Sequence, residues 1–117
     1  MADSEFLKGL ASSREVEITV TGRRSGRSIS TPVWFVHESG KLYLLPVNGS
    51  DSNWYKNVMT KPEMQISAKG RKVTVKASPI LDPDKFKKVV EKFRSKYGAG
   101  EIRRYYSKLD AAIELPI

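Results

Sequence analysis

Residues 21–57 read TGRRSGRSISTPVWFVHESGKLYLLPVNGSDSNWYKN, and this stretch decides the fold. It begins with a basic turn between two glycines and continues into a strand at 28–37 that is rich in β-branched and aromatic residues. The turn 38–41 leads into a further strand at 41–47, and the polar loop 48–53 leads into a helix. Cations, an apolar wall and a polar loop with two aromatic rings are therefore close in sequence, as an anionic, flat ligand would need.

The flanking sequence predicts more strands. From Glu15 to Thr21, apolar Val16, Ile18 and Val20 alternate with polar residues, which is the period of a half-buried strand. Further strands are predicted at 63–69, 72–80 and 111–115. Because most connections are too short for a crossover helix, we expect a mainly β (α+β) fold: an antiparallel barrel of about six strands.

Helices are predicted at the edges of this barrel, one of them after the strand 41–47 and two before the last strand. A short helix at 4–11 has Ser4 as its cap, and Asp51 or Ser52 caps a second that ends before Pro62. Asp82 caps a third, which Gly98 stops, and a fourth covers about 101–108. Pro32 and Pro46 each lack an N–H, so we expect both at an edge, a bulge or a strand end.

Composition sets the outer limits. The 117 residues, 39% of them hydrophobic, suffice for one domain, 1–117. The absence of cysteine excludes disulfides, thiolate metal sites and cysteine nucleophiles. The N-terminus Met1–Glu5 lacks the layout of a signal peptide and no apolar stretch is long enough to span a membrane, so we expect a cytoplasmic protein. The net charge of +8 favours anionic ligands.

Few residues could perform acid–base chemistry. The only histidine, His37, lies at a strand end, and residues 18–76 contain three acidic side chains against ten Lys or Arg. An enzyme built on this chain would therefore rely on a bound cofactor for its reactivity, with no protein catalytic residue and no metal. The best candidate anion site is the turn with Arg23, Arg24, Ser25 and Arg27, because guanidinium groups grip phosphate and carboxylate oxygens.

The ordered set of motifs TGRRSG, TPVWFV and GSDSNWYKN, followed by Pro62 and an alternating strand, resembles the deazaflavin-dependent nitroreductase family. That family lies within the split β-barrel group of FMN-binding and pyridoxamine 5′-phosphate oxidase-like proteins. The resemblance covers about residues 15–80. It implies a split β-barrel that binds coenzyme F420 and transfers a hydride from the reduced deazaflavin to a small hydrophobic acceptor, such as a quinone, an enone or a nitro compound.

The resemblance also implies roles for individual residues. Arg23, Arg24 and Ser25 would meet the phosphate and carboxylates of the cofactor tail, and Arg27 would supply a further cation. The ring would lie against the strand residues Pro32, Val33 and Trp34, with Leu45, Pro46 and Val47 alongside. Asn48, Gly49, Ser50 and Ser52 would line the phosphate groove, with Trp54, Tyr55 and Asn57 fixing that loop. By analogy with related barrels, we expect a homodimer.

Other functions fit parts of the sequence. The barrel could bind FMN instead of F420, or carry a cofactor without turnover. A basic barrel with Trp34, Phe35, Tyr43 and Tyr55 could also stack the bases of a single-stranded nucleic acid. Against this last reading, Trp34 and Phe35 are adjacent in a strand and must point to opposite faces. We therefore expect a small-molecule acceptor and no nucleic acid as partner.

Overall fold

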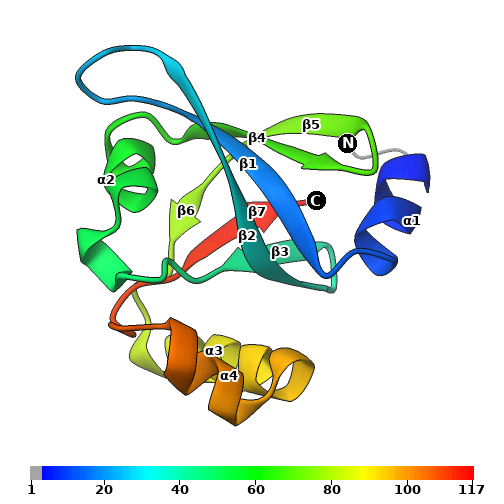
Figure 1. Ribbon diagram of the computed structural model, residues 1–117, viewed down its shortest axis with the longest axis vertical. Helices are drawn as coiled ribbons and strands as arrows, with labels where there is room; N and C mark the ends of the chain where they lie inside the picture. The colour runs from blue at the N-terminus through cyan, green and yellow to red at the C-terminus, as the bar shows by residue number, and fades with distance from the viewer. Residues whose placement is uncertain (1–3) are drawn as a thin grey trace.

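The computed structural model describes residues 4–117, in which a curled antiparallel sheet is flanked by helices (Figure 1). Residues 1–3, part of the stretch considered above for a signal peptide, lie outside the described residues. The elements are α1 (Ser4–Ala11), β1 (Glu15–Thr21), β2 (Ser28–Glu38), β3 (Lys41–Leu44), a short 3-10 helix (Gly49–Asp51), α2 (Asn53–Thr60), β4 (Glu63–Ala68), β5 (Arg71–Lys76), β6 (Ser78–Pro79), α3 (Pro83–Tyr97), α4 (Ala99–Tyr105) and β7 (Ile113–Pro116).

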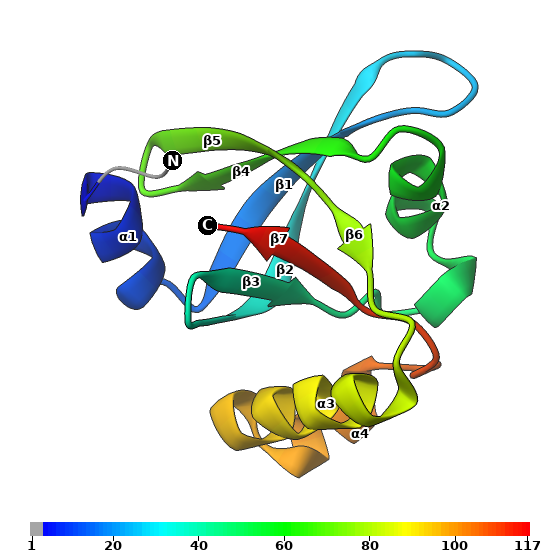
Figure 2. The ribbon, with the colours of Figure 1, turned by 180° about the vertical axis from the view of Figure 1, so that it is seen from behind.

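The sheet has the strand order β5-β4-β1-β2-β3-β7-β6, and every neighbouring pair is antiparallel. The expected split β-barrel class is confirmed. Strand β2 joins the two halves, because its residues 28–34 pair with β1 and its residues 35–38 pair with β3. Figure 2 shows β3, β7 and β6 across the curl from β4 and β5. Pro32 lies in the part of β2 that pairs with β1 alone, which suits a residue without an N–H.

Two apolar cores lie on opposite sides of β2. Inside the curl, Phe35 packs with the inward-facing residues of β1 and β4 and with Phe6 and Leu10 of α1. Outside it, Val36 packs beneath α3 and α4, and Trp34 contacts this second core. The alternation predicted for β1 is confirmed, since Val16, Ile18 and Val20 are all buried.

Helix α3 follows from local signals in the sequence. The Asp82 side chain accepts a hydrogen bond from the Asp84 backbone N–H at 3.0 Å, and Gly98 ends the helix with a φ of +98°. The apolar stripe packs against the second core, where Tyr97 is buried. The Tyr97 hydroxyl accepts from the Phe35 N–H at 3.1 Å and donates to the Arg14 carbonyl at 2.6 Å, so α3 is fixed to both β2 and the start of β1.

The sequence-based boundaries of several elements differ from the structure; β7, for example, covers Ile113–Pro116 rather than 111–115. Strand β3 ends at Leu44 rather than at residue 47, and Pro46 lies beyond its end. The strand expected at 72–80 is divided into β5, which pairs with β4, and β6, which pairs with β7; this division makes the total seven rather than about six. Helix α4 starts earlier and ends earlier than expected. Ser52 holds the N-cap position of α2, but its hydroxyl does not cap the helix.

Candidate functional site

The basic turn between β1 and β2 is closed by its own backbone. The Gly22 N–H donates to the Arg27 carbonyl at 2.8 Å, and the Gly26 N–H donates to the Gly22 carbonyl at 2.9 Å. Gly26 has a φ of +71°, a conformation that glycine adopts at low cost. Figure 1 shows this hairpin loop extending past the sheet on the side of α2. The backbone of the basic turn therefore lies beyond the edge of the sheet, beside α2.

Arg23 attaches the turn to α2. Its backbone N–H and its Nη1 both donate to the Oδ1 atom of Asn57, at 3.0 and 2.8 Å, and Nη1 also lies 3.4 Å from the Asn53 carbonyl. Asn57 is 4% exposed, so this amide is removed from water and depends on Arg23 for its partner. Part of the Arg23 guanidinium is thus used to hold the turn, whereas Arg24 has no such contact to a described residue.

Between the turn, β2 and α2 lies a first cavity of about 650 Å³. Its basic end is formed by the turn, and its wall by apolar residues of β1 and β2 together with Trp54. The sequence-predicted residues that line it are Arg23, Arg24, Ser25, Pro32, Val33, Val47, Asn48, Ser52, Trp54 and Asn57. Ile29 and Val47, both exposed apolar side chains, also lie on its lining. The cavity therefore has an anion-attracting end and an apolar side.

Seven predicted residues do not line this first cavity: Trp34, Leu45, Arg27, Pro46, Gly49, Ser50 and Tyr55. Trp34 and Leu45 line a second cavity. The Arg27 side chain is exposed at the turn, and Pro46 is buried. Tyr55 packs against the inner core, in agreement with a role in holding α2. Gly49 and Ser50 face the C-terminal segment instead.

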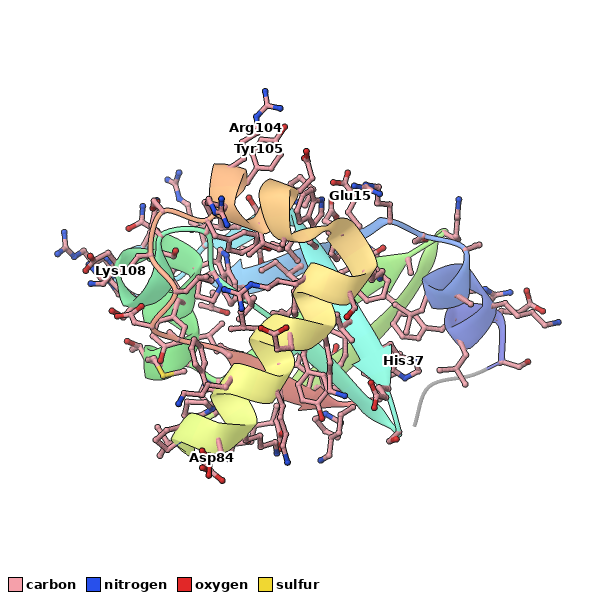
Figure 3. The ribbon with its side chains drawn as sticks, turned by 90° about the horizontal axis from the view of Figure 1, so that it is seen from below. Glu15, His37, Asp84, Arg104, Tyr105 and Lys108 are labelled. Carbon is pink, nitrogen blue, oxygen red and sulfur yellow. The ribbon has the colours of Figure 1, made fainter. Side chains whose placement is uncertain are left out.

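The second cavity, of about 460 Å³, adjoins the first. Both are lined by Pro32, Val33, Val47 and Trp54, so one wall of β2 and α2 residues serves both cavities. The second cavity adds Arg14 and Glu15 at the start of β1, and Glu101, Tyr105 and Tyr106 of the α4 region. Figure 3 shows Arg104 and Tyr105 at the exposed end of α4. A ligand in the first cavity would thus have a direct neighbour in the second.

Aromatic rings surround Trp34 in the second cavity. Tyr97 stacks on it with a centroid distance of 4.3 Å, Tyr105 meets it edge-on at 5.6 Å, and Tyr106 lies at 6.1 Å. The Arg14 guanidinium lies 5.5 Å from the centroid of the Trp34 ring. Burial raises the pKa of the Tyr106 hydroxyl, with a smaller contribution from Tyr97, so Tyr106 stays a neutral donor at physiological pH.

A set of polar contacts between residues 47–52 and residues 107–110 has no local signal in the sequence. The Asp110 carboxylate accepts from the Ser50 N–H at 2.8 Å and from the Ser50 hydroxyl at 2.6 Å. These bonds lower the pKa of Asp110, the hydroxyl contributing most, and nearby Lys108 adds to the shift. Sequence reasoning missed Asp110 because its partner lies 60 positions away.

Neither cavity contains a histidine. His37 lies at the far end of β2, where its Nε2 atom is buried without a hydrogen-bond partner (Figure 3). Burial lowers the pKa of His37, and the Lys96 ammonium lowers it further. Among residues 4–117, no group of three or more His, Cys, Asp or Glu side chains could hold a metal ion.

The four aromatic residues considered above for stacking nucleic-acid bases do not share one face of the protein. Trp34 and Tyr43 pack against the outer core, while Phe35 and Tyr55 pack against or within the inner core. A groove of about 670 Å³ between β2 and α3 is lined by several lysines, but it contains no aromatic ring, and Lys92 there is paired with Glu38. Trp34, Phe35, Tyr43 and Tyr55 therefore share no common face on which successive bases could stack.

A family model for the "Uncharacterized protein conserved in bacteria (DUF2255)" family matches residues 6–112. The chain belongs to the DUF2255 family. No curated protein matches the sequence of this DUF2255 protein. Within its described residues, no helix has the length and apolar character needed to cross a membrane.

Solved structures with the same fold carry different activities. An F420-H2 dependent reductase aligns with a TM-score of 0.68 and 20% identity, over 87% of the DUF2255 chain and 93% of its own. HutZ, the heme storage protein from Vibrio cholerae, aligns with a TM-score of 0.73 and 12% identity, over 97% of the DUF2255 chain and 88% of its own. A structure described as a domain-swapped dimer aligns with a TM-score of 0.70 and 20% identity, over 87% of the DUF2255 chain and 79% of its own. At these identities the similarity establishes the fold of the DUF2255 protein.

Proposed function

We propose that this DUF2255 protein is a reductase that binds coenzyme F420 in the first cavity and reduces a small hydrophobic acceptor in the second. The observation that carries the proposal is the shared wall of Pro32, Val33, Val47 and Trp54, which makes the two cavities neighbours. A two-substrate hydride transfer needs adjoining sites, because the reacting atoms must approach to about 3–3.5 Å.

The lining of the first cavity fits a flavin-type cofactor. Arg24 and Ser25 at the basic end suit phosphate and carboxylate oxygens, and the apolar wall suits a planar ring. The bound cofactor would supply the hydride, so the scarcity of acid–base residues is no obstacle. The same lining contains no His, Cys, Met or Tyr, the residues that commonly ligate haem iron, which favours a flavin-type group over haem.

The chain's own residues would position the acceptor and keep water away from it. The apolar and aromatic lining of the second cavity favours a flat, poorly hydrated molecule such as a quinone, an enone or a nitro compound. The neutral hydroxyl of Tyr106 would supply a hydrogen bond to such an acceptor, since Tyr106 lines the cavity and burial raises the pKa of its hydroxyl.

The test compares two arginines from one turn. Purified protein is titrated with F420 and separately with FMN, following the fluorescence of Trp34 and Trp54. Arg24→Ala should weaken cofactor binding about tenfold or more, because a charged hydrogen-bond partner is lost. Arg27→Ala removes the same charge from the same turn at a position outside the cavity, and should change affinity little. Arg24 is preferred to Arg23, whose removal would also release Asn57.

Each outcome selects one function. Tight F420 binding with turnover of quinone or nitro acceptors supports the reductase, and binding without turnover indicates a cofactor carrier. A preference for FMN changes the cofactor and keeps the site. If the protein binds neither F420 nor FMN, the proposal is overturned. Salt-sensitive binding of single-stranded nucleic acid is then the next function to test. We also propose a homodimer, supported by the dimeric relative of the same fold and testable by sedimentation.

A further inference from the structure

Two segments far apart in sequence meet where the two cavities adjoin. Residues 47–52, the cavity loop, contribute Val47, Asn48 and Ser52 to the first cavity. Residues 107–110, the clasp segment, directly follow the α4 region whose Tyr105 and Tyr106 line the second cavity. Contacts between the cavity loop and the clasp segment therefore connect a wall of one cavity to a wall of the other.

Asp110 makes the central contact. One of its carboxylate oxygens accepts from the Ser50 N–H at 2.8 Å, and the other accepts from the Ser50 hydroxyl at 2.6 Å. Lys108 adds charge pairing, with its ammonium 3.1 Å from Asp51 and 3.5 Å from Asp110. A carboxylate that receives two hydrogen bonds from one residue fixes both the position and the orientation of that residue.

Ser107 continues the contact along the loop. Its N–H donates to the Val47 carbonyl at 2.9 Å, and its hydroxyl donates to the Asn48 side-chain oxygen at 2.6 Å. Within the loop, the Asn48 N–H donates to the Ser52 hydroxyl at 2.9 Å. The orientation of Asn48 and Ser52, two polar groups of the first cavity, thus depends on this chain of hydrogen bonds.

The fit between the segments is close at Gly49. A Cβ atom there would lie 2.0 Å from an Asp110 carboxylate oxygen and 2.9 Å from the Lys108 carbonyl oxygen. Gly49 also has a φ of +57°. The loop can approach Asp110 this closely only because residue 49 has no side chain.

We propose that Asp110 is a positioning residue that fastens the cavity loop to the clasp segment, and so holds the walls of both cavities in one arrangement. Its effect on cofactor affinity rests on the proposed function. Its effect on the two segments does not, because that follows from the contacts alone. Asp110 lines neither cavity, and it acts through Ser50.

Three variants of the full chain test this. Asp110→Ala removes both acceptors. Asp110→Asn keeps an oxygen for the Ser50 N–H and offers an amide donor to the Ser50 hydroxyl, which can accept as well as donate. Asp84→Ala is the control, because it removes a carboxylate from the first turn of α3, whose position in Figure 3 is far from Lys108. The measurements are amide hydrogen exchange of Ser50 and Ser107, and F420 and FMN affinity by tryptophan fluorescence.

We expect Asp110→Ala to raise the exchange rates of the Ser50 and Ser107 amides about tenfold or more and to weaken cofactor binding by a similar factor. We expect Asp110→Asn to restore most of the protection of these amides and most of the cofactor affinity. Unchanged exchange in Asp110→Ala, or faster exchange at Ser50 alone, would overturn the proposal. The proposal would also be overturned if both amides of Asp110→Ala exchanged faster while this variant bound the cofactor as tightly as the wild type does. If the wild type binds neither cofactor, the proposed function fails, and exchange at the two amides still decides whether Asp110 fastens the two segments.

Discussion

The side-chain oxygen of Asn57 accepts two hydrogen bonds from one residue, Arg23: one from its backbone N–H at 3.0 Å and one from its Nη1 at 2.8 Å. The basic turn between β1 and β2 is thereby attached to helix α2, 34 positions along the chain. A hairpin tip that would otherwise move freely in solvent becomes one end of a cavity with a defined shape.

Asn57→Ala should lower the free energy of unfolding by about 1–3 kcal/mol, because it leaves two Arg23 donors without their partner and a void at a buried position. Urea denaturation measures the change. Asn53→Ala is the matched control, since Asn53 is exposed and only its backbone carbonyl approaches Arg23. Equal stability of the two variants would show that the Arg23–Asn57 contact does not stabilise the fold.

Tyr97→Phe should be destabilising by about 1–2 kcal/mol. The hydroxyl that it removes accepts from the Phe35 N–H and donates to the Arg14 carbonyl, and both partners would lose that bond. Ring stacking on Trp34 is kept, so the loss reports the hydroxyl alone. Tyr105→Phe alters a more exposed ring beside the same tryptophan and should have little effect on the denaturation midpoint.

Gly49→Ala should destabilise the protein more than Gly70→Ala does. Both glycines have a positive φ, near +57° and +80°, so both substitutions carry the backbone cost of about 1–2 kcal/mol for a left-handed alanine. Only residue 49 also meets Asp110, whereas nothing lies within 4 Å of a Cβ at residue 70. In an Asp110→Ala background the cost at residue 49 should fall but stay above that at residue 70, because the Lys108 carbonyl oxygen would still lie 2.9 Å from the Cβ; a double-mutant cycle in thermal denaturation measures the change.

Protonation of His37 should destabilise the folded state. Burial, and secondarily Lys96, lower the pKa of His37 below its ordinary value of 6.5, so the unfolded chain binds this proton more readily. The stability contribution is complete above pH 6.5 and is lost as the pH falls from there through the folded-state pKa. Because the chain has one histidine, His37→Gln should flatten the stability profile between about pH 5 and 7; an unchanged slope would contradict this.

Local patterns in the sequence predicted much of the fold. The alternation from Glu15 to Thr21 predicted β1 with its observed bounds, and Asp82 with Gly98 predicted both ends of α3. The hairpin glycines predicted the basic turn, and the adjacency of Trp34 and Phe35 predicted that their rings separate, as the two cores confirm. Each of these features depends on neighbours within a few positions along the chain.

Contacts between distant segments could not be predicted in the same way. Ser52 has the sequence context of a helix cap, but the loop folds back on itself and the Ser52 hydroxyl accepts a hydrogen bond from the Asn48 N–H instead. Ser50 was expected to face the phosphate groove, and it bonds Asp110 instead, 60 positions away. Whether the residues that line the first cavity bind a cofactor stays a prediction. The second cavity depends on packing between β2 and α4, which no local pattern specifies.

The two cavities draw on separate stretches of the chain. The first cavity is lined by residues between 18 and 57. The second cavity is also lined by residues 14–15 and by side chains between residues 101 and 106, which do not line the first. Substitutions or short insertions around α4 can therefore reshape the second cavity without touching the basic turn. The shape of the second cavity can therefore vary during evolution while the first cavity stays unchanged, and a mutant library restricted to those residues would test this independence.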